Sequence, residues 1–160
     1  MSGKSPTIKI SDLSGAKAAI ISARWHSEIC DQLVAGATRA VKEANIQSID
    51  LHEVPGSFEL PLAAKLALTN GADFAVVLGV VLRGETPHFD YVCQGVTNGV
   101  MKVSLKLDKP IGFGVLTVDN MEQAIARSGA PGSKEDKGYD SAIAALELLR
   151  LKRQLSGRFV

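Results

Sequence analysis

Short apolar runs alternate along the chain with longer stretches in which apolar residues recur at helical spacing. The run at 76–82, VVLGVVL, is β-branched and contains no polar residue, a pattern typical of a strand covered on both faces of a parallel sheet. Apolar segments at 18–22, within 46–54 and at 111–117 predict three more strands. A β-like piece at 7–10 is too short to stand alone, so it predicts a frayed end or an edge addition to a neighbouring subunit.

Stripes of apolar residues at helical spacing predict helices between these strands. The stripes follow the first strand (Cys30, Leu33, Val34, Ala37, Val41, Ala44), the Pro55-Gly56 turn (Leu60, Ala63, Ala64, Ala67, Leu68) and the 76–82 run (Phe89, Val92, Cys93, Val96, Val100, Val103, Leu107), and a last one lies near the end of the chain (Ile143, Leu146, Leu149). Ser57 and Thr86 are predicted N-caps, with Pro87 at a first helical position. A capping box at 119–122 predicts a short helix ending near Gly129.

Alternating strands and helices argue for right-handed βαβ units around a parallel sheet. We expect one domain over 1–160, with an N-terminal arm at 1–15. The predicted fold class is α/β, a flavodoxin-like three-layer α/β/α sandwich with a central parallel sheet of about four strands plus a short N-terminal strand. No GxGxxG or Walker sequence is present, so dinucleotide and P-loop sites lack support.

Composition removes several classes of partner. The 18 basic and 17 acidic residues give a net charge of +1, which offers no electrostatic case for nucleic acid or an anionic membrane surface. No apolar segment of a signal peptide follows Met1, so the cytoplasm is the expected compartment. Cys30 and Cys93 lie on apolar helical faces and are expected to be buried, reduced thiols. No Cys/His spacing suggests a metal site, and no cofactor is expected.

Candidate chemistry collects in three strand-to-helix turns. They carry Trp25-His26, the segment 55–59 (PGSFE) and the segment 83–88 (RGETPH). Ligands of open α/β sheets bind outside the carboxyl ends of the strands, where these turns should converge. The set offers an aromatic face, a carboxylate, an imidazole and free backbone N–H groups at 84–88 that suit phosphate. It offers no activated Ser or Cys nucleophile.

Each of these residues also has a plainer interpretation when it is taken alone. Trp25 could fill a core or an interface, and Glu59 could be a solvated acid favoured by the helix dipole. His88 could be an ordinary polar residue at a helix start. Arg127 and Lys137 are typical of surface cations.

Several motifs favour the functional interpretation together. The segment 79–92, GVVLRGETPHFDYV, resembles the signature of the 6,7-dimethyl-8-ribityllumazine synthase family. The resemblance extends in the same order to 54–61 (VPGSFELP), 114–117 (GVLT), 122–129 and Lys137-Gly138, and so covers nearly the whole chain. Members of this family condense 5-amino-6-(D-ribitylamino)uracil with 3,4-dihydroxy-2-butanone 4-phosphate, the penultimate step of riboflavin biosynthesis. That chemistry needs alignment and proton shuttling rather than a metal or a covalent intermediate.

The resemblance implies a role for each matching residue. His88 would donate and accept protons, Trp25 would stack on the pyrimidine ring, and Glu59 would accept hydrogen bonds from the ribityl chain. Further substrate-binding positions implied by the resemblance are Ser57, Phe58, Val80, Val81, Leu82, Glu85, Thr86, Phe113, Arg127 and Lys137. In the family, Phe113 and Arg127 reach the site of the adjacent subunit.

The resemblance also implies a homo-oligomer. Family members form pentamers, and some assemble these into sixty-subunit shells. The loop at 130–136 is longer than in shell-forming relatives, which favours a free pentamer. Glu85 departs from the neutral residues common at the phosphate loop, so we expect its side chain to face solvent. An archaeal-type riboflavin synthase and a non-catalytic flavin- or lumazine-binding protein on the same scaffold remain as alternatives.

Overall fold

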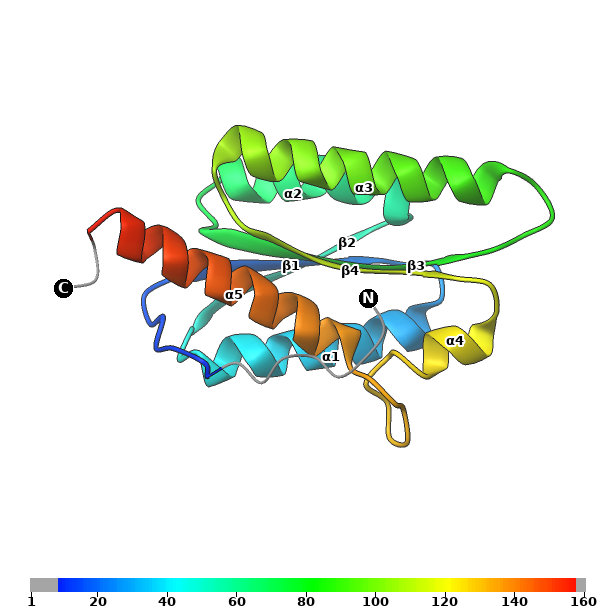
Figure 1. Cartoon of the computed structure of the whole chain (residues 1–160), viewed down its shortest axis with the longest axis horizontal. Helices are drawn as coiled ribbons and strands as arrows, with labels where there is room; N and C mark the ends of the chain where they lie inside the picture. Colours follow the sequence, from blue (N-terminus) through cyan, green and yellow to red (C-terminus); the bar gives the residue numbers. More distant parts are fainter. Residues whose placement is uncertain (1–8, 158–160) are drawn as a thin grey trace.

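A computed structural model describes residues 9–157 of the chain. Its centre is a parallel sheet of β1 (Lys17–Ala23), β2 (Ser48–Val54), β3 (Phe74–Leu82) and β4 (Ile111–Val118), in the spatial order β2-β1-β3-β4 (Figure 1). The predicted α/β fold and its four strands are therefore confirmed. Residues 7 and 8 of the β-like piece predicted at 7–10 lie outside the described residues, and Lys9 and Ile10 belong to no strand.

Helices cover both faces of the sheet and make three layers (Figure 1). The helices α1 (Ser27–Glu43), α4 (Met121–Ile125) and α5 (Lys137–Leu155) lie on one side. On the other side lie α2 (Leu60–Thr69), which follows a short 3-10 turn at Ser57–Glu59, and α3 (His88–Leu107).

The unbroken apolar run of β3 is explained by its central position. Phe74, Val76 and Leu78 pack in the cluster with α1 and α5, whereas Ala75 and Val77 pack in the cluster with α2 and α3. All five are fully buried, so a polar residue on either face would lose its water without gaining a partner. The strand is thereby held rigidly beneath the loop that follows it.

The order of the strands fixes where a ligand site can form. From β1 the chain moves to β2 on one side and then crosses to β3 on the other, so β1 and β3 flank the topological switch point. Ser22 of β1 pairs with Leu78 of β3, and Leu78 pairs with Gly114 of β4, so the strands end at one edge. Ligands of such sheets bind in the crevice at that edge and switch point.

Two helix starts differ from the prediction by one residue. Helix α3 begins at His88 with Pro87 in the cap position, not Thr86, because the N–H groups of Asp90 and Tyr91 donate to the Pro87 carbonyl. Helix α4 is capped by Asn120, whose side-chain oxygen accepts the N–H of Gln123 at 3.0 Å. This is an example of the usual uncertainty in helix ends.

Two further predictions about ends and thiols were wrong. Helix α4 ends at Ile125 rather than near Gly129, because the Ala126 carbonyl accepts the N–H groups of Lys134 and Glu135 from across the following loop instead of continuing the helix. Cys30 is buried as expected, but Cys93 is only half-buried. No helix among residues 9–157 is both long and apolar enough to cross a bilayer.

Candidate active site

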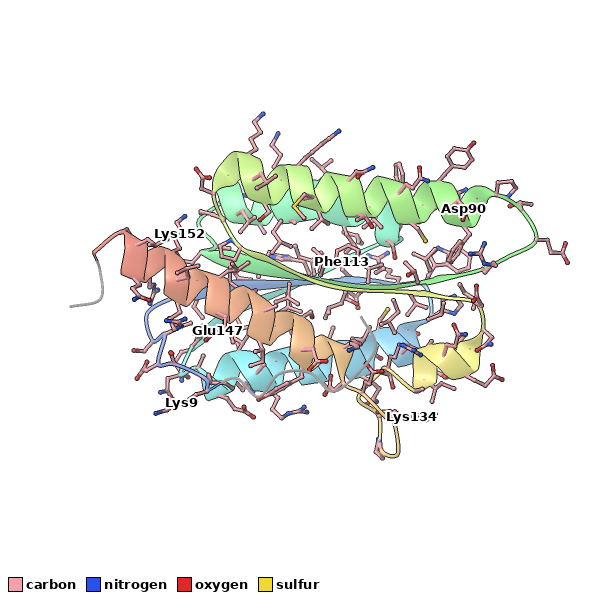
Figure 2. The ribbon with its side chains drawn as sticks, viewed as in Figure 1. Lys9, Asp90, Phe113, Lys134, Glu147 and Lys152 are labelled. Carbon is pink, nitrogen blue, oxygen red and sulfur yellow. The ribbon has the colours of Figure 1, made fainter. Side chains whose placement is uncertain are left out.

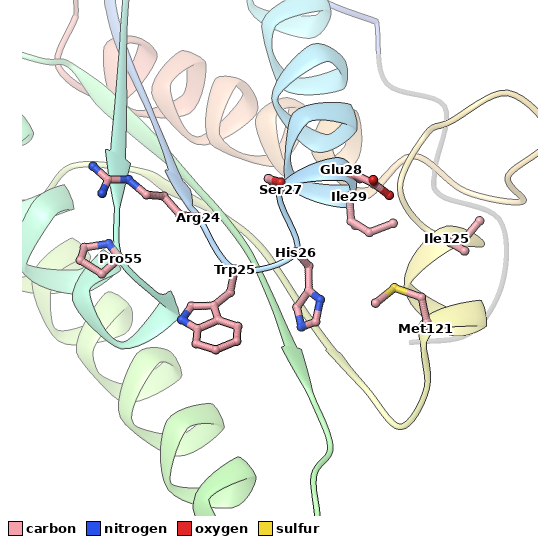
Figure 3. Close-up of a pocket in the computed structure, with 9 residues that line it drawn as sticks. All are labelled: Arg24, Trp25, His26, Ser27, Glu28, Ile29, Pro55, Met121 and Ile125. Carbon is pink, nitrogen blue, oxygen red and sulfur yellow. The ribbon is translucent and has the colours of Figure 1, made fainter.

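The turn after β1 places Trp25 and His26 at the carboxyl edge. Trp25 is 69% exposed, and its ring lies 6.3 Å from the His26 ring at a tilt of 53° (Figure 3). His26 adopts a left-handed conformation with φ of 58°, which costs a non-glycine residue about 1 kcal/mol or more. Its carbonyl accepts the N–H groups of Ile29 and Cys30, so the turn bends sharply into α1. The sharp turn leaves the indole uncovered at the edge of the sheet.

An open hollow of about 540 Å³ lies between this turn and α4. Its lining includes Trp25 and His26 on one side and Met121 and Ile125 on the other (Figure 3). His88 does not line it. Within one chain, therefore, this hollow contains only Trp25 of the predicted site residues.

The turn after β2 lies directly against Trp25. The Gly56 N–H donates to Glu59 Oε2 at 2.8 Å, which folds the carboxylate back over the turn. A Cβ at Gly56 would lie 3.5 Å from Trp25 Cδ1, so the indole and this turn are in contact. Phe58 packs on α3 at Gly95, where an added Cβ would come within 2.5 Å of the Phe58 ring. The structure thus brings Trp25, the 55–59 turn and Gly95 of α3 to one region.

Ser57 occupies an unusual environment in the same turn. It is only 6% exposed, and its hydroxyl is the one buried side-chain oxygen of residues 9–157 that lacks a hydrogen-bond partner. It does not cap a helix, as the sequence predicted, because Gly56 holds the cap position. Ser57 Oγ lies against β3, 2.5 Å from where Gly79 would carry a Cβ. Buried hydroxyls usually have a hydrogen-bond partner, so Ser57 stands out among the buried serines of residues 9–157.

The end of β3 presents backbone rather than side chains to the crevice. Val80 and Val81 are buried, one in each hydrophobic cluster, and Leu82 packs at the border of the first. Only their main-chain groups are therefore open to a ligand. Beyond them Glu85, Thr86 and His88 are all exposed, with His88 as the first residue of α3.

Phe113 does not lie at this edge within its own chain. It sits mid-strand in β4 opposite Val77, five pairs before the Leu82–Val118 pair, which is about 16 Å along the strand. Figure 2 shows Phe113 near the middle of the sheet and Asp90 at the start of α3. The ring is 40% exposed on an edge strand. Phe113 is thus remote from the crevice of its own chain.

Arg127 and Lys137 also lie apart from the three turns. Arg127 Nη1 donates to the Gln123 carbonyl at 2.9 Å, just after α4. Lys137 is ion-paired with Glu135 and with Asp140, the latter at 3.2 Å. The Glu135 carboxylate, followed by Asp140, raises the pKa of Lys137 and keeps it charged. In the described part of the chain, no hydrogen bond or ion pair joins either cation to the three turns.

The thiol nearest to Trp25 is not a reactive one. The Cys30 Sγ–H donates to the Trp25 carbonyl at 3.4 Å, and burial raises the pKa of this thiol to about 11. A neutral thiol is a poor nucleophile. Across residues 9–157, no three His, Cys, Asp or Glu side chains are grouped as metal ligands would be.

Comparison with known proteins shows which family the chain belongs to. Residues 15–153 match the family of 6,7-dimethyl-8-ribityllumazine synthase. The chain belongs to this family. A 6,7-dimethyl-8-ribityllumazine synthase of Streptomyces coelicolor is 48% identical over 98% of both chains. One of Paenarthrobacter aurescens is 52% identical over 98% of this chain and all of its own. The resemblance read from the sequence motifs is confirmed.

Two groups of residues in this lumazine synthase family member were missed by sequence reasoning. Arg83 links the end of β3 to two carboxylates, and an arginine directly after a buried strand, with acids on the elements that follow, was the available signal. Asp136 accepts hydrogen bonds from Arg39 and from the Tyr139 N–H, at 2.8 and 2.9 Å. Cβ atoms at Gly36 and Gly129 would each come within 2.5 Å of its carboxylate. Such long-range contacts leave no local pattern in the sequence.

Proposed function

We propose that this chain condenses 5-amino-6-(D-ribitylamino)uracil with 3,4-dihydroxy-2-butanone 4-phosphate to give 6,7-dimethyl-8-ribityllumazine, phosphate and water. It is then a transferase of riboflavin biosynthesis that needs no cofactor. The observation that carries the proposal is the contact of Trp25 with the turn before Glu59 at the switch point of the sheet, with His88 opening the helix after the neighbouring strand, in a chain of this family. These groups fit a flat heterocycle with a polyol tail.

The pyrimidine lies against the turns after β1 and β2. The exposed Trp25 indole stacks on the ring, and main-chain groups of 80–82 bond its edge because the side chains there are buried. Glu59 accepts from the ribityl hydroxyls, and Ser57 and Phe58 line the same segment. Contact between the indole and Gly56 supports one continuous subsite.

The second substrate lies against the 84–88 loop. Backbone N–H groups there, with Thr86, bind the phosphate at the start of α3. The uracil amine attacks the ketone and an imine forms with loss of water. Phosphate then leaves, and ring closure releases a second water. His88, exposed at the same helix start, moves the protons of these steps and contributes on the order of 10²-fold or more.

The complete site is shared between two copies of the chain. Arg127 neutralises the phosphate and Phe113 covers the pyrimidine of the adjacent subunit, with Lys137 near the phosphate region. The mid-strand position of Phe113, remote from its own crevice, supports this arrangement. Exposed apolar residues on α2 and α3, Leu62, Leu66, Met101 and Leu105, support close packing of copies. A free pentamer in the cytoplasm is the assembly that we propose.

The direct test mixes the purified protein with both substrates and follows the lumazine chromophore. We expect product only when both substrates are present. Product from lumazine alone would favour a riboflavin synthase, and binding without turnover would favour a non-catalytic protein. His88→Gln should slow turnover while the Kd for the pyrimidine stays within about twofold, because a proton carrier adds little to ground-state binding.

Co-expression of His88→Ala with Arg127→Ala tests whether the site is shared. Each variant alone should be nearly inactive. In a ring whose interfaces join unlike surfaces, random mixing leaves about a quarter of the sites with both residues intact. Recovery of about that fraction supports a shared site, whereas no recovery in verified mixed oligomers would contradict it. Native mass measurement gives the assembly size in the same samples.

A further inference from the structure

Arg83 is the first residue after β3, in the loop that leads to His88 at the start of α3. Its main-chain N–H donates to the Val118 carbonyl at 2.9 Å, so the end of β3 is fixed to the end of β4. Its side chain then turns toward the following helix. Arg83 Nε donates to Asp119 Oδ1 at 2.7 Å, and Nη1 lies 3.7 Å from Asp90 Oδ1. The guanidinium also stacks on the Phe89 ring, with its centre 4.0 Å from the ring centroid.

These contacts hold the two residues immediately after His88. Asp90 and Phe89 belong to the first turn of α3, whereas Asp119 belongs to the loop between β4 and α4. A planar guanidinium can hold two carboxylates and an aromatic face at once, which a lysine ammonium cannot do. The start of α3, and with it His88, is thereby fixed relative to β4.

The same set of bonds continues toward Arg127. The Asp119 N–H donates to Gln123 Oε1 at 2.9 Å, and the Gln123 carbonyl accepts from Arg127 Nη1 at 2.9 Å. One continuous path of hydrogen bonds therefore runs from Arg83 through Asp119 and Gln123 to the Arg127 guanidinium. It joins the loop proposed to bind phosphate with the cation proposed to bind the phosphate of a neighbour.

We propose that Arg83 is a positioning residue of the condensation, which sets His88 and the 84–88 loop through Phe89 and Asp90, and Arg127 through Asp119. This inference rests on the proposed function. Arg83 itself is not the phosphate cation, since two carboxylates already surround it. Its role is geometric, and a misplacement of about 1 Å at a reacting group costs on the order of 10²-fold in rate.

The exposure of Arg83 and its two carboxylate partners allows a positioning role to be distinguished from a role in stability. The side chains of Arg83, Asp90 and Asp119 are 48%, 58% and 64% exposed. Exposed ion pairs contribute about 0–1 kcal/mol to stability, so their loss should leave the fold intact. An effect on catalysis at unchanged stability would then identify positioning.

The test compares Arg83→Met, Arg83→Lys and Asp119→Asn with the native chain. For Arg83→Met we expect kcat to fall about 10-fold or more and the KM for the butanone phosphate to rise, with an unchanged pyrimidine Kd. Arg83→Lys should be faster than Arg83→Met but slower than the native chain, because lysine keeps the positive charge but lacks the planar, multiple-donor guanidinium. Asp119→Asn should raise the same KM and lower kcat less. The pH–rate profile of each variant should keep the native shape at a lower plateau, since no proton carrier is removed.

Arg150→Gln is the matched control, because Arg150 pairs with Glu147 on α5 in a partly exposed bridge away from the three turns. Its kcat and both binding constants should stay native. The inference is overturned if Arg83→Met keeps kcat and KM within twofold of native, or if it loses pyrimidine affinity as strongly as rate. A native chain that forms no lumazine would instead refute the proposed function, so the two failures are distinguishable.

Discussion

Replacing Ser57 by alanine should stabilise the protein while it weakens substrate binding. The Ser57 hydroxyl is buried against Gly79 and has no hydrogen-bond partner in the described chain. A buried polar group without a partner costs about 1–3 kcal/mol. Removing one heavy atom also loses a few contacts of about 0.1–0.2 kcal/mol each. We therefore expect the free energy of unfolding to rise by about 1 kcal/mol, near the lower end of that range.

Ser141→Ala is the matched control for this change. Ser141 is buried to the same degree, but its hydroxyl donates to the Gly138 carbonyl at 3.0 Å. Its removal should lower the free energy of unfolding by about 0.5–1.5 kcal/mol, because a made hydrogen bond is lost. The same substitution, serine to alanine, should therefore raise the free energy of unfolding at Ser57 and lower it at Ser141.

Urea unfolding at a fixed protomer concentration measures both changes, because an oligomer's stability depends on concentration. Titration calorimetry with the pyrimidine measures the second effect. There Ser57→Ala should weaken binding about 3- to 10-fold, the value of one hydrogen bond of about 0.5–1.5 kcal/mol. A destabilised Ser57→Ala variant that binds the pyrimidine with native affinity would refute the reasoning.

Three further predictions follow from the same structure. Because the Glu85 side chain is exposed and expected to face solvent, Glu85→Gln should leave the KM for the butanone phosphate unchanged; a lowered KM would show that the carboxylate repels the phosphate. Gly138→Ala should cost about 3 kcal/mol or more by urea unfolding, because its Cβ would lie 2.0 Å from the Leu33 carbonyl oxygen; a native midpoint would contradict this close packing. Because burial raises the pKa of Cys30 from 9.0 to about 11, the stability that the neutral thiol contributes is complete below pH 9 and is lost as pH rises through 11. Cys30→Ala should flatten that part of the stability–pH curve, and an unchanged slope would contradict the assignment.

The fold was predictable because its signals are periodic and local. The apolar run of β3 could only be a strand buried on both sides, and the stripes of α1 and α3 matched the helices that formed. Helix ends were less predictable, since Thr86 and Asp119 have the right side chains but the neighbouring residues took the cap positions. Capping depends on backbone angles that single residue types do not determine.

The strand-end positions of the candidate site residues were predictable from the fold, whereas their roles stay predictions. The turns at the ends of β1, β2 and β3 lie at one edge of the sheet, as their positions after parallel strands require. Phe113 and Arg127 could be named only through the family resemblance, since no local pattern tells an edge-strand aromatic that serves a neighbour from an ordinary surface residue. Arg83 was missed because its partners lie 7 and 36 positions away along the chain.

The contacts that hold Asp136 at the base of the loop at 128–136 have a practical consequence for attaching other molecules to this protein. The strand-like bridge between Ser128 and Asp136, and the Gly129 N–H bond to the Glu135 carbonyl, close the base of the loop that carries Lys134 and protrudes beyond α1 and α5 (Figures 1 and 2). A peptide or tag spliced in beside Gly132, where a Cβ would meet no atom within 4 Å, would extend a tip that is anchored below. The loop tip is therefore a suitable insertion site, and every copy of the chain in an assembly would display the inserted peptide.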